Sequence, residues 1–463
     1  MIIRDKKFHF IAIGGVGMSA LAKYLVQKGA IVSGSDAVES KYTKALTNLG
    51  ATISIGHNKE LVKDDMIIVA STAIKETNPE IIRAKELGLK IYHRSDILKI
   101  ISDDFVENEK GIFFGFAGTH GKTTTSGLCS YVLSKGNLRP SFVVGGIIPE
   151  LNTNGEFADN KYFCAELDES DGTIQKYSTS FAIINNMEED HLDYYTNGFS
   201  DIVKTFNKFL SNNPKQTVII NIDDEGNNKF KEIYPNYKYI TFGLNNGDYT
   251  AKNIEFIGLG SKFDIYYKNE KIDTLELSVL GKHNVYNALA VYVALKEANI
   301  NTNNLKEYFK TFSGMGRRFQ KVCSFNNIEI YDDYAHHPSE IKTTITSVKN
   351  AVGDKNRVVA IFQPHRYTRL KGLWEEFKQS FNNADLLITV DVFSAGEEEI
   401  ENINSKAFTE EIQHQNAIYI QGNIETASKK IYPLLNRNDI VITLGAGTIT
   451  KLGNLIEEEY KVK

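Results

Sequence analysis

The 463-residue sequence has few cysteines, no excess of positive charge and no long hydrophobic run, and each shortage excludes a class of protein. Its three cysteines, Cys129, Cys164 and Cys323, are widely spaced and form no C-x-x-C pair. This pattern excludes a disulfide-rich secreted fold and predicts buried thiols in a reducing cytoplasm. The 53 basic and 58 acidic side chains give a net charge of −5, which argues against nucleic acid as the main partner.

No apolar stretch is long enough to span a bilayer, so we expect no membrane partner. The first apolar run, residues 8–13, has only the length of a strand and no cleavage site follows it, so we expect no signal peptide. Hydrophobic residues make up 42% and charged residues 24% of the chain, which is typical of a soluble globular protein. The length predicts about three domains rather than a single core.

The motif on which the predicted function most depends is a glycine-containing turn between an apolar strand at residues 111–117 and a helical pattern. The turn and the first residues of the helix are Gly118, Thr119, His120, Gly121, Lys122, Thr123, Thr124 and Thr125. Backbone N–H groups in such a turn cradle phosphate oxygens together with the helix N-terminus. Lys122 would reach the terminal phosphates of a nucleotide, and the hydroxyl of Thr123 would ligate its magnesium ion.

The full Walker spacing is not present in this turn, because Phe116 occupies the position of its first glycine. The alternative to a phosphate loop is an ordinary glycine turn with a lysine at the surface. A strand precedes the turn and a helix follows it, as phosphate binding requires, so we favour nucleotide binding.

A second glycine motif follows residues 8–13 and reads Gly14-Gly15-Val16-Gly17-Met18-Ser19-Ala20. Its spacing matches G-x-G-x-x-[GA], and the next apolar strand ends at Ser35 and Asp36, where a dinucleotide fold places an acid against a ribose. Strand, turn, helix, strand and acid occur in order, so we favour ligand binding over simple close packing of strand and helix. Any diphosphate linked to a ribose satisfies this geometry.

Polar residues follow two later apolar segments of this N-terminal region, with Ser71 after the first and His93 and Arg94 after the second. They would share the carboxyl edge of the sheet with the glycine turn, where ligands bind in open α/β sheets. This region by itself would also support an NAD-dependent oxidoreductase. That alternative leaves the turn at residues 118–125 without a role, so we disfavour it.

Carboxylates follow two apolar strands of the central region, at residues 162–165 and 181–184. The first strand leads into a segment that begins with Glu166, and the second leads into one that contains Asp190 and His191. Carboxylates at such strand ends can hold a magnesium ion that bridges phosphate oxygens, and we favour this over solvated loops. In this setting His191 is a candidate metal ligand.

The pattern changes after these strands. Short alternating segments with turn signals, from about residue 215 to 280, predict a small antiparallel addition. Asn284 and Asn287 share a face of the first turn of the next helix, and the pattern does not decide between helix caps and ligands. From residue 314 onward, strands and helices alternate again, which predicts a third sheet domain.

The strand ends of this last region are rich in imidazoles and cations, among them His336, His365 and Arg369. They contrast with the acidic strand ends of the central region. Such a contrast suits an anionic substrate held between domains. We favour this binding role for the basic cluster over the alternative that Arg366 and Arg369 are only surface charges.

In this order the motifs resemble those of the Mur ligases of peptidoglycan synthesis, and the resemblance covers essentially the whole chain. It rests on Gly14-Gly15-Val16-Gly17-Met18-Ser19, Gly118 to Thr125, Asp168-Glu169-Ser170-Asp171-Gly172, Asp190-His191-Leu192-Asp193, His283-Asn284, Asp333-Tyr334-Ala335-His336-His337-Pro338 and Gln363-Pro364-His365-Arg366-Tyr367-Thr368-Arg369. Two departures are visible: Leu167 stands where alanine is expected, and Asn185-Asn186-Met187 where threonine, asparagine and isoleucine are usual. Sister enzymes carry a carboxylated lysine at a second metal, and none can be placed here.

The resemblance implies an ATP-dependent amide ligase that joins L-alanine to the lactyl carboxylate of UDP-N-acetylmuramate through an acyl phosphate, with ATP and Mg²⁺. A relative that attaches a recycled peptide to the same sugar nucleotide is the alternative, and the run from His365 to Arg369 favours the alanine-adding activity. The implied fold is α/β in three domains. These are a Rossmann-like UDP-sugar-binding domain at residues 1–107, a P-loop-type ATP-binding domain at 108–313 with a mostly parallel sheet, and a Rossmann-like amino-acid-binding domain at 314–463. We expect a monomer or a weak dimer.

Carried over residue by residue, the resemblance implies a role for each motif. The catalytic residues would be Lys122, Glu166 and His191, and the metal ligands would be Thr123, Glu166 and His191. ATP would contact Gly118, Thr119, His120, Gly121, Lys122, Thr123, Thr124, Asn284, Asn287, Arg318 and Asp333. The UDP-sugar would contact Gly15, Gly17, Met18, Ser19, Ser35, Asp36, Ser71, His93 and Arg94. The amino acid would contact His336, His365 and Arg369.

Overall fold

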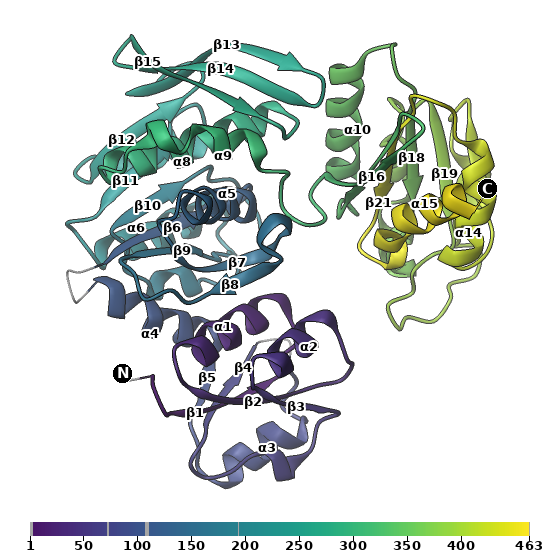
Figure 1. Ribbon diagram of the computed structural model, residues 1–463. Coiled ribbons are helices and arrows are strands. Elements are labelled where there is room, and N and C mark those ends of the chain that lie inside the picture. Colours follow the sequence, from purple (N-terminus) through teal and green to yellow (C-terminus); the bar gives the residue numbers. More distant parts are fainter. Residues whose placement is uncertain (1–2, 72–73, 107–110, 193, 463) are drawn as a thin grey trace. The chain divides into compact units, whose positions relative to one another are not determined.

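Over the residues that the structure describes, the chain forms three β-sheets covered by helices, in two compact units (Figure 1). This computed structural model describes residues 3–71, 74–106, 111–192 and 194–462. The first unit comprises Met1–Ile254, Phe263–Glu276 and Lys282–Phe312, and the second comprises Glu255–Lys262, Leu277–Gly281 and Ser313–Lys463. The predicted α/β class is confirmed. The division at 1–107, 108–313 and 314–463 stays a prediction, and its first boundary lies outside the described residues.

The N-terminal sheet is parallel throughout, in the order β3-β2-β1-β4-β5. Its strands are β1 (Lys7–Ile11), β2 (Ile31–Asp36), β3 (Thr52–Ile55), β4 (Ile67–Ala70) and β5 (Ile91–His93). The helices of this region are α1 (Val16–Gln27), α2 (Lys41–Asn48), η1 (Lys59–Leu61), α3 (Pro79–Glu86) and α4 (Arg94–Val106). The strand order reverses between β1 and β4, so the turn after β1 lies at the kind of crevice where ligands bind.

The central sheet has ten strands in the order β15-β14-β13-β12-β11-β10-β6-β9-β7-β8. Its strands are β6 (Ile112–Ala117), β7 (Ser141–Ile148), β8 (Thr153–Glu156), β9 (Tyr162–Glu166), β10 (Phe181–Ile184), β11 (Thr217–Asn221), β12 (Lys238–Gly243), β13 (Tyr249–Ile257), β14 (Gly260–Tyr267) and β15 (Glu270–Leu277). Its helices are α5 (Lys122–Lys135), η2 (Pro149–Leu151), η3 (Thr173–Lys176), α6 (Phe199–Ser211), α7 (Glu225–Ile233), α8 (Lys282–Glu297), η4 (Thr302–Asn304) and α9 (Lys306–Thr311). Strand β6 pairs in parallel with both β9 and β10, so the segments after these three strands share one edge of the sheet.

One hydrophobic core serves both sheets of the first unit, running from Ile3 in the N-terminal region to Phe230 in α7. Phe105 of α4 stacks on Phe163 of β9, with 5.0 Å between the ring centroids. Tyr24 of α1 meets Phe157 edge to face at 5.3 Å. Burial of these large aromatic surfaces stabilises the packing of the two sheets within one unit.

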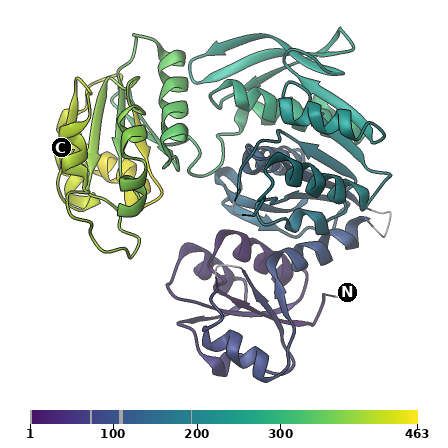
Figure 2. The same ribbon diagram turned by 180° about the vertical axis from the view of Figure 1, so that it is seen from behind.

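The sheet of the second unit has the order β16-β17-β21-β18-β19-β20, with only β16 antiparallel to its neighbour. Its strands are β16 (Gln320–Phe325), β17 (Ile328–Asp333), β18 (Val358–Phe362), β19 (Leu386–Val390), β20 (Ala417–Ile420) and β21 (Ile440–Leu444). Its helices are α10 (Pro338–Val352), α11 (Tyr367–Gly372), α12 (Trp374–Lys378), α13 (Ser405–Glu411), α14 (Ile424–Ile431), η5 (Tyr432–Leu434), η6 (Thr448–Lys451) and α15 (Leu452–Val462). Two hydrophobic clusters lie on its opposite faces, and both views show helices covering them (Figures 1 and 2).

Candidate active site

The turn at residues 118–121 joins β6 to α5, which is the strand, turn and helix that the sequence predicted. Gly118 has φ +125° and Gly121 has φ +80°, both in the half of backbone space that glycine tolerates best. A Cβ on Gly118 would lie 2.8 Å from the backbone oxygen of Asn186, and one on Gly121 would lie 2.8 Å from Oδ1 of Asn287. Gly118 is therefore required by conformation and by space, whereas Gly121 is favoured chiefly by its conformation.

Asn186, which follows β10, fixes the backbone of this turn. Its backbone oxygen accepts the N–H of Thr119 at 3.3 Å, and its side-chain Oδ1 accepts the N–H of His120 at 2.7 Å. Its Nδ2 donates to the backbone oxygen of His120 at 3.2 Å. Since these two N–H groups bond to Asn186, the donors for a phosphate would be those at the N-terminus of α5.

A chain of side-chain hydrogen bonds joins the phosphate loop to α8. Asn185 donates from Nδ2 to Oγ1 of Thr125 at 2.8 Å, and Thr125 donates to Oδ1 of Asn287 at 3.1 Å. Asn287 in turn donates to Oδ1 of Asn284 at 3.0 Å. These bonds place the two α8 asparagines beside the loop, where an ATP ligand would have to lie. Their contact with ATP stays a prediction.

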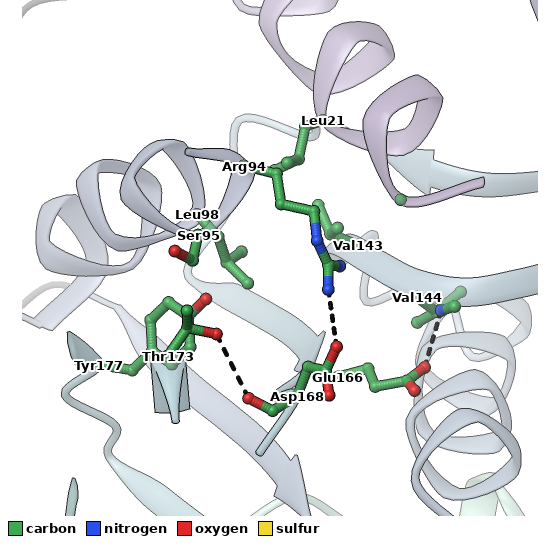
Figure 3. A pocket seen from close by; sticks show the side chains of 12 residues that line it. Leu21, Arg94, Ser95, Leu98, Val143, Val144, Glu166, Asp168, Thr173 and Tyr177 are labelled. Atoms are coloured by element: carbon green, nitrogen blue, oxygen red, sulfur yellow. Dashed lines mark hydrogen bonds and ion pairs between the residues drawn. The ribbon is translucent and has the colours of Figure 1, made fainter. Parts of the chain in front are cut away.

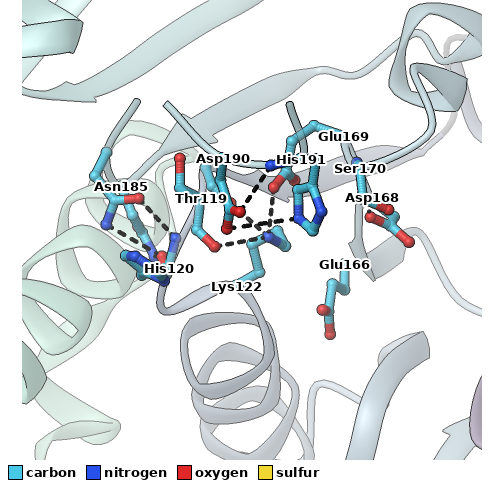
Figure 4. A network of polar contacts seen from close by, with 12 residues as sticks. Thr119, His120, Lys122, Glu166, Asp168, Glu169, Ser170, Asn185, Asp190 and His191 are labelled. Atoms are coloured by element: carbon cyan, nitrogen blue, oxygen red, sulfur yellow. Dashed lines mark hydrogen bonds and ion pairs between the residues drawn. The ribbon is translucent and has the colours of Figure 1, made fainter. Parts of the chain in front are cut away.

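The ammonium of Lys122 lies against the loop rather than in solvent, with 14% of the side chain exposed (Figure 4). It donates to the backbone oxygens of Gly118 at 2.6 Å and Thr119 at 3.0 Å. Its third acceptor is Oε1 of Glu169, at 2.9 Å. The lysine is therefore positioned at the N-terminus of α5, where the terminal phosphates of a nucleotide would bind.

Glu166, the last residue of β9, lies beside the next residue of the helix. The hydroxyl of Thr123 donates to Oε1 of Glu166 at 3.0 Å, and the backbone N–H of Gly145 donates to Oε2 at 2.8 Å. A Cβ on Gly145 would lie 2.3 Å from Oε2, so a larger residue there would displace the Glu166 carboxylate from this position. Burial raises the pKa of Glu166, against the opposing charge of Lys122. A hydroxyl beside a desolvated carboxylate matches the donors that Mg²⁺ uses in phosphate sites, so this pair fits the predicted cation.

His191 lies at the same rim but not in a cluster of ligands. Its ring is 40% exposed, and its Nε2 lies 3.7 Å from Oδ2 of Asp190 (Figure 4). Among the residues that the structure describes, no group of three or more His, Cys, Asp or Glu side chains is placed to hold a metal. The structure thus brings Thr123 and Glu166 together, while the metal role of His191 stays a prediction.

The N-terminal glycine turn, residues 12–15, is held by Asp36 at the end of β2. The backbone N–H of Gly14 donates to Oδ2 of Asp36 at 2.8 Å, and a Cβ on Gly14 would lie 2.8 Å from the same oxygen. Met18 is 4% exposed and belongs to the core, while Ser19 donates to the main chain of its own helix. Asp36, predicted as a ribose ligand, therefore positions the turn itself, and its contact with a ribose stays a prediction.

Ser35 belongs to a buried polar network on the N-terminal sheet. Its hydroxyl donates to Oε2 of Glu80 at 2.8 Å, and His9 bonds to the same oxygen at 3.0 Å. Oε1 of Glu80 accepts the backbone N–H of Asn58 at 3.0 Å. Burial raises the pKa of Glu80, but the hydrogen bonds from His9 and Ser35 outweigh it and hold the pKa below its ordinary value. The Ser35 side chain is fully buried, so its predicted contact with the UDP-sugar stays untested.

A cavity of about 190 Å³ lies between the start of helices α1 and α4 and the carboxylates of the central sheet (Figure 3). Its walls include Gly17, Arg94, Ser95, Glu166, Asp168 and Thr173. Arg94 donates from Nη2 to Oδ2 of Asp168 at 2.6 Å. Burial raises the pKa of Asp168, but hydrogen bonds from Ser170 and the charge of Arg94 hold it below its ordinary value, so the carboxylate stays ionised. The cavity thus joins a predicted UDP-sugar residue, Arg94, to a predicted catalytic residue, Glu166.

Ser71 and His93 lie where the sequence predicted, at the carboxyl edge of the N-terminal sheet. Ser71 directly follows β4, and His93 is the last residue of β5. The imidazole Nδ1 of His93 lies 2.7 Å from the hydroxyl of Ser95. Burial lowers the pKa of His93, and the charge of Arg94 adds to this effect, so the ring is neutral near pH 7. Their position at this edge is as predicted, and their contact with the UDP-sugar stays a prediction.

Arg318 and Asp333, the remaining predicted ATP ligands, belong to the second unit. Asp333 ends β17, and its carboxylate accepts the backbone N–H groups of Phe319 at 2.9 Å and Ala335 at 2.7 Å. Burial raises its pKa to about 6. The exposed guanidinium of Arg318 lies 5.8 Å from the ring centroid of Tyr334. Their contact with ATP stays a prediction.

The three predicted amino-acid-binding residues lie together in the second unit. Arg369 donates from Nη1 to Nδ1 of His365 at 3.0 Å, and the rings of His336 and His365 are 6.1 Å apart. Burial lowers the pKa of His365 to about 4, and the charges of Arg369 and His336 act in the same direction. His365 is therefore neutral near pH 7 and accepts the arginine's hydrogen bond, which orients the guanidinium.

Lys122 and Thr123 are neighbours at the start of α5, and each pairs with a different carboxylate from the segment at the end of β9. This arrangement is suited to binding nucleotide phosphates. These pairs and the parallel sheets define the class, a nucleotide-dependent α/β enzyme. Three family models match consecutive parts of the chain. They are the Mur ligase family catalytic domain at residues 7–106, the Mur ligase middle domain at 116–295 and the Mur ligase glutamate ligase domain at 317–447. The chain belongs to the Mur ligase family.

Relatives match over nearly the full length. The chain is 36% identical to the UDP-N-acetylmuramate–L-alanine ligase of Geotalea daltonii over 461 residues, which is 98% of each chain. It is 38% identical to the enzyme of the same name from a Sulfurihydrogenibium species, covering 99% of this chain and 98% of the relative. The crystal structure of UDP-N-acetylmuramate-alanine ligase from Thermotoga maritima superposes with a TM-score of 0.82 at 28% identity, covering 99% of this chain and all of that one.

Three contributors to the site have no role in the sequence analysis: Glu169, Gly145 and Asn186. Glu169 stands in the acidic run Asp168-Glu169-Ser170-Asp171, and nothing local distinguishes it from its neighbours. Gly145 belongs to a glycine pair within an otherwise apolar strand, which is a signal for close backbone approach. Asn186 acts through its backbone oxygen and its side-chain amide together, and only its position after a strand could have indicated it.

Proposed function

We propose that the chain is an ATP-dependent ligase that joins L-alanine to the lactyl carboxylate of UDP-N-acetylmuramate in the synthesis of peptidoglycan precursors. The observation that carries this proposal is the match, at 36–38% identity over at least 98% of this chain, to enzymes named for that reaction. The phosphate loop and its paired carboxylates support it independently.

The proposed reaction has two steps. The lactyl carboxylate attacks the terminal phosphorus of ATP, so that a P–O bond forms, the bond to the β-phosphate oxygen breaks and ADP leaves. The amine of alanine then attacks the acyl carbon. A C–N bond forms, the C–O bond to phosphate breaks, and the amine loses its extra proton as inorganic phosphate departs. The first step brings a carboxylate against a triphosphate, so cations must offset their repulsion.

Two residues at the start of α5 would meet this requirement. The ammonium of Lys122 would bind the terminal phosphates as a fixed positive charge. Thr123 and Glu166 would hold Mg²⁺, which when bound supplies positive charge against the transferred phosphoryl group. Glu166 is also fixed by the N–H of Gly145, so its carboxylate does not have to reorient to bind the ion. Such fixed charges act without reorganisation during the reaction.

We assign the lactyl end of the sugar nucleotide to the cavity between Arg94 and Glu166. A ligand in this cavity would extend from Gly17, in the first turn of α1, to the residues that hold the phosphates. We assign the carboxylate of alanine to Arg369, because the planar guanidinium matches a carboxylate and His365 holds it in place.

Two alternatives are less well supported. Attachment of a recycled peptide would use the same sugar nucleotide and phosphate loop, but the relatives with the highest similarity described above are named for alanine. An NAD-dependent oxidoreductase would not need Lys122 or Thr123, and the family to which the chain belongs consists of ligases.

The test is phosphate release by the purified protein with ATP, Mg²⁺ and UDP-N-acetylmuramate, run across the twenty amino acids. We expect release only when the sugar nucleotide and L-alanine are both present, with glycine and serine as the informative competitors, since one methyl group discriminates by only ~1–3 kcal/mol. Release with a tripeptide but not with alanine would replace the proposal by the recycling activity. Reduction of NAD would replace it by the oxidoreductase.

The expected location is the cytoplasm, where nucleotide-linked precursors and free thiols both occur. Cys129 and Cys164 are buried with their sulfur atoms 3.7 Å apart, and neither they nor Cys323 forms a disulfide within the described ranges. In those ranges no helix combines the length and hydrophobicity needed to cross a bilayer. A monomer or weak dimer stays our expectation.

A further inference from the structure

The three N–H donors of the Lys122 ammonium face three acceptors, and one of them is a carboxylate to which neither motif nor resemblance gave a role. Gly118 and Thr119 supply backbone oxygens at 2.6 and 3.0 Å, and Glu169 supplies Oε1 at 2.9 Å (Figure 4). An ammonium has no fourth donor. A phosphate can therefore bind Lys122 directly only by replacing one of these partners.

Glu169 is buried and firmly held. It is 3% exposed, and its backbone oxygen accepts a hydrogen bond from the hydroxyl of Tyr195, itself 2% exposed. Its second carboxylate oxygen, Oε2, has no hydrogen-bond partner among the described residues. Burying a carboxylate with one oxygen unsatisfied costs stability, so a purely structural role explains the pair poorly.

The two carboxylates of this segment contact different residues at the start of α5. Glu166 contacts Thr123, and Glu169 contacts Lys122, so adjacent loop residues each have their own acidic partner. The backbone oxygens that bind Lys122 are neutral and belong to its own turn, whereas Glu169 carries the only opposite charge in contact with the ammonium among the described residues. Exchange between Glu169 and a phosphate swaps one anion for another and keeps the lysine's charge paired throughout.

We propose that Glu169 is a positioning residue for Lys122: it holds the ammonium at the N-terminus of α5 and yields it to the terminal phosphate of the bound nucleotide. This inference rests on the proposed function, which makes Lys122 the cation for phosphoryl transfer. Glu169 thereby sets the orientation of the Lys122 side chain. It also sets how tightly a phosphate must bind the ammonium in order to displace the carboxylate. Removing the negative charge of Glu169 should slow phosphoryl transfer without weakening ATP binding.

The test is steady-state kinetics of Glu169→Gln, which keeps the shape of the side chain and removes its charge. We expect kcat to fall at least tenfold, equivalent to about 1.4 kcal/mol, while the KM for ATP stays equal or falls. Glu169→Asp keeps the charge on a shorter arm and should recover part of the lost kcat. A kcat that falls less than tenfold, or a KM for ATP that rises, overturns the proposal.

The matched control is Glu225→Gln, which removes the charge of an exposed Glu–Lys pair of the same unit, 2.6 Å from Lys229. It should leave kcat and KM within twofold of wild type. Thermal unfolding of all variants identifies loss of fold. Should Glu169→Gln fail to fold, Glu169→Asp is measured alone, and a kcat equal to wild type then contradicts the proposal.

Calorimetric titration with Mg-ATP separates this inference from the proposed function, because it needs no turnover. If wild-type protein makes no ADP with the sugar nucleotide and alanine, the proposed function fails. The inference is still tested, since Glu169→Gln should bind Mg-ATP at least as tightly as wild type, and Lys122→Ala at least tenfold more weakly. Weaker binding by Glu169→Gln contradicts the role of Glu169 in either case.

Discussion

The two glycine turns of the first unit have the same length but differ in the backbone conformation of the residue before the helix. Each joins a strand to a helix through four residues, 12–15 and 118–121. The residue before the helix is Gly15 in one turn, with φ −63°, and Gly121 in the other, with φ +80°. Any residue adopts the first conformation, whereas the second strongly favours glycine. The conformation of the residue before the helix therefore favours glycine only in the second turn.

Charge also distinguishes the two turns. Asp36 accepts a backbone N–H of the first turn, while the second places Lys122 as the first residue of its helix, where the first has Val16. If the two motifs are aligned by their glycines rather than by the starts of their helices, Lys122 pairs with Met18, which lies two residues after Val16. The comparison teaches that glycine spacing indicates a turn, and that the charged groups fixed around it determine which part of a nucleotide it can bind.

The largest effect should come from Lys122→Ala, which removes the charge that distinguishes the second turn. We expect kcat to fall by roughly 10²–10³ or more, since a fixed donor at the transferred group is lost. Binding of UDP-N-acetylmuramate, measured by calorimetry, should be unchanged. The control is Lys135→Ala at the other end of α5. Turnover that survives in Lys122→Ala would remove the functional difference between the turns.

Alanine substitutions compare the backbone requirements directly. Gly118→Ala places a Cβ at φ +125° and 2.8 Å from a backbone oxygen, so we expect a loss of ~2–4 kcal/mol in the free energy of unfolding. Gly15→Ala meets only ordinary contacts from 3.6 Å, and should cost less than ~1 kcal/mol. Urea unfolding measures both. Equal losses would show that the two glycines are needed for the same reason.

The buried polar network next to the first turn can be tested with Glu80→Gln. This variant removes the negative charge of the carboxylate to which His9 and Ser35 are both hydrogen-bonded. Leaving buried donors poorly matched should cost ~1–3 kcal/mol near pH 7. Because the pKa of Glu80 is held below its ordinary value of 4.5, the stability it contributes is present above that pH and is lost as the pH falls further. The difference in unfolding free energy between wild type and variant should therefore narrow below about pH 4.5. A difference that is constant down to pH 3 would contradict this account.

A small effect should also come from Asp36→Ala, which frees the N–H groups of Gly14 and Val38. We expect ~1 kcal/mol of lost stability and a severalfold rise in KM for the UDP-sugar, because the first turn loses its anchor. The KM for ATP should not change. If it rose as well, the two turns would not act on separate ligands.

How much of the site could be predicted depended on how far apart its parts lie in the sequence. The strand, turn and helix around Gly118, with Lys122 and Thr123 at the helix start, follow from local spacing and were predicted. The partner of Lys122 lies 47 residues away, and nothing near Glu169 distinguishes it from Glu166. For Ser35 the local sequence suggested a ligand contact, and it could not show that the hydroxyl donates to Glu80, 45 residues away.

The sequence by itself determined the α/β alternation, the family and the residues at each strand end, because hydrophobic periodicity and glycine spacing are local properties. Only the tertiary structure decided which carboxylate faces which residue of the phosphate loop. It also decided that Asp36 holds a turn and that the first two sheets share one core. The physical reason is that hydrogen bonds and packing join residues by distance in space, and strand order brings distant segments to a common edge.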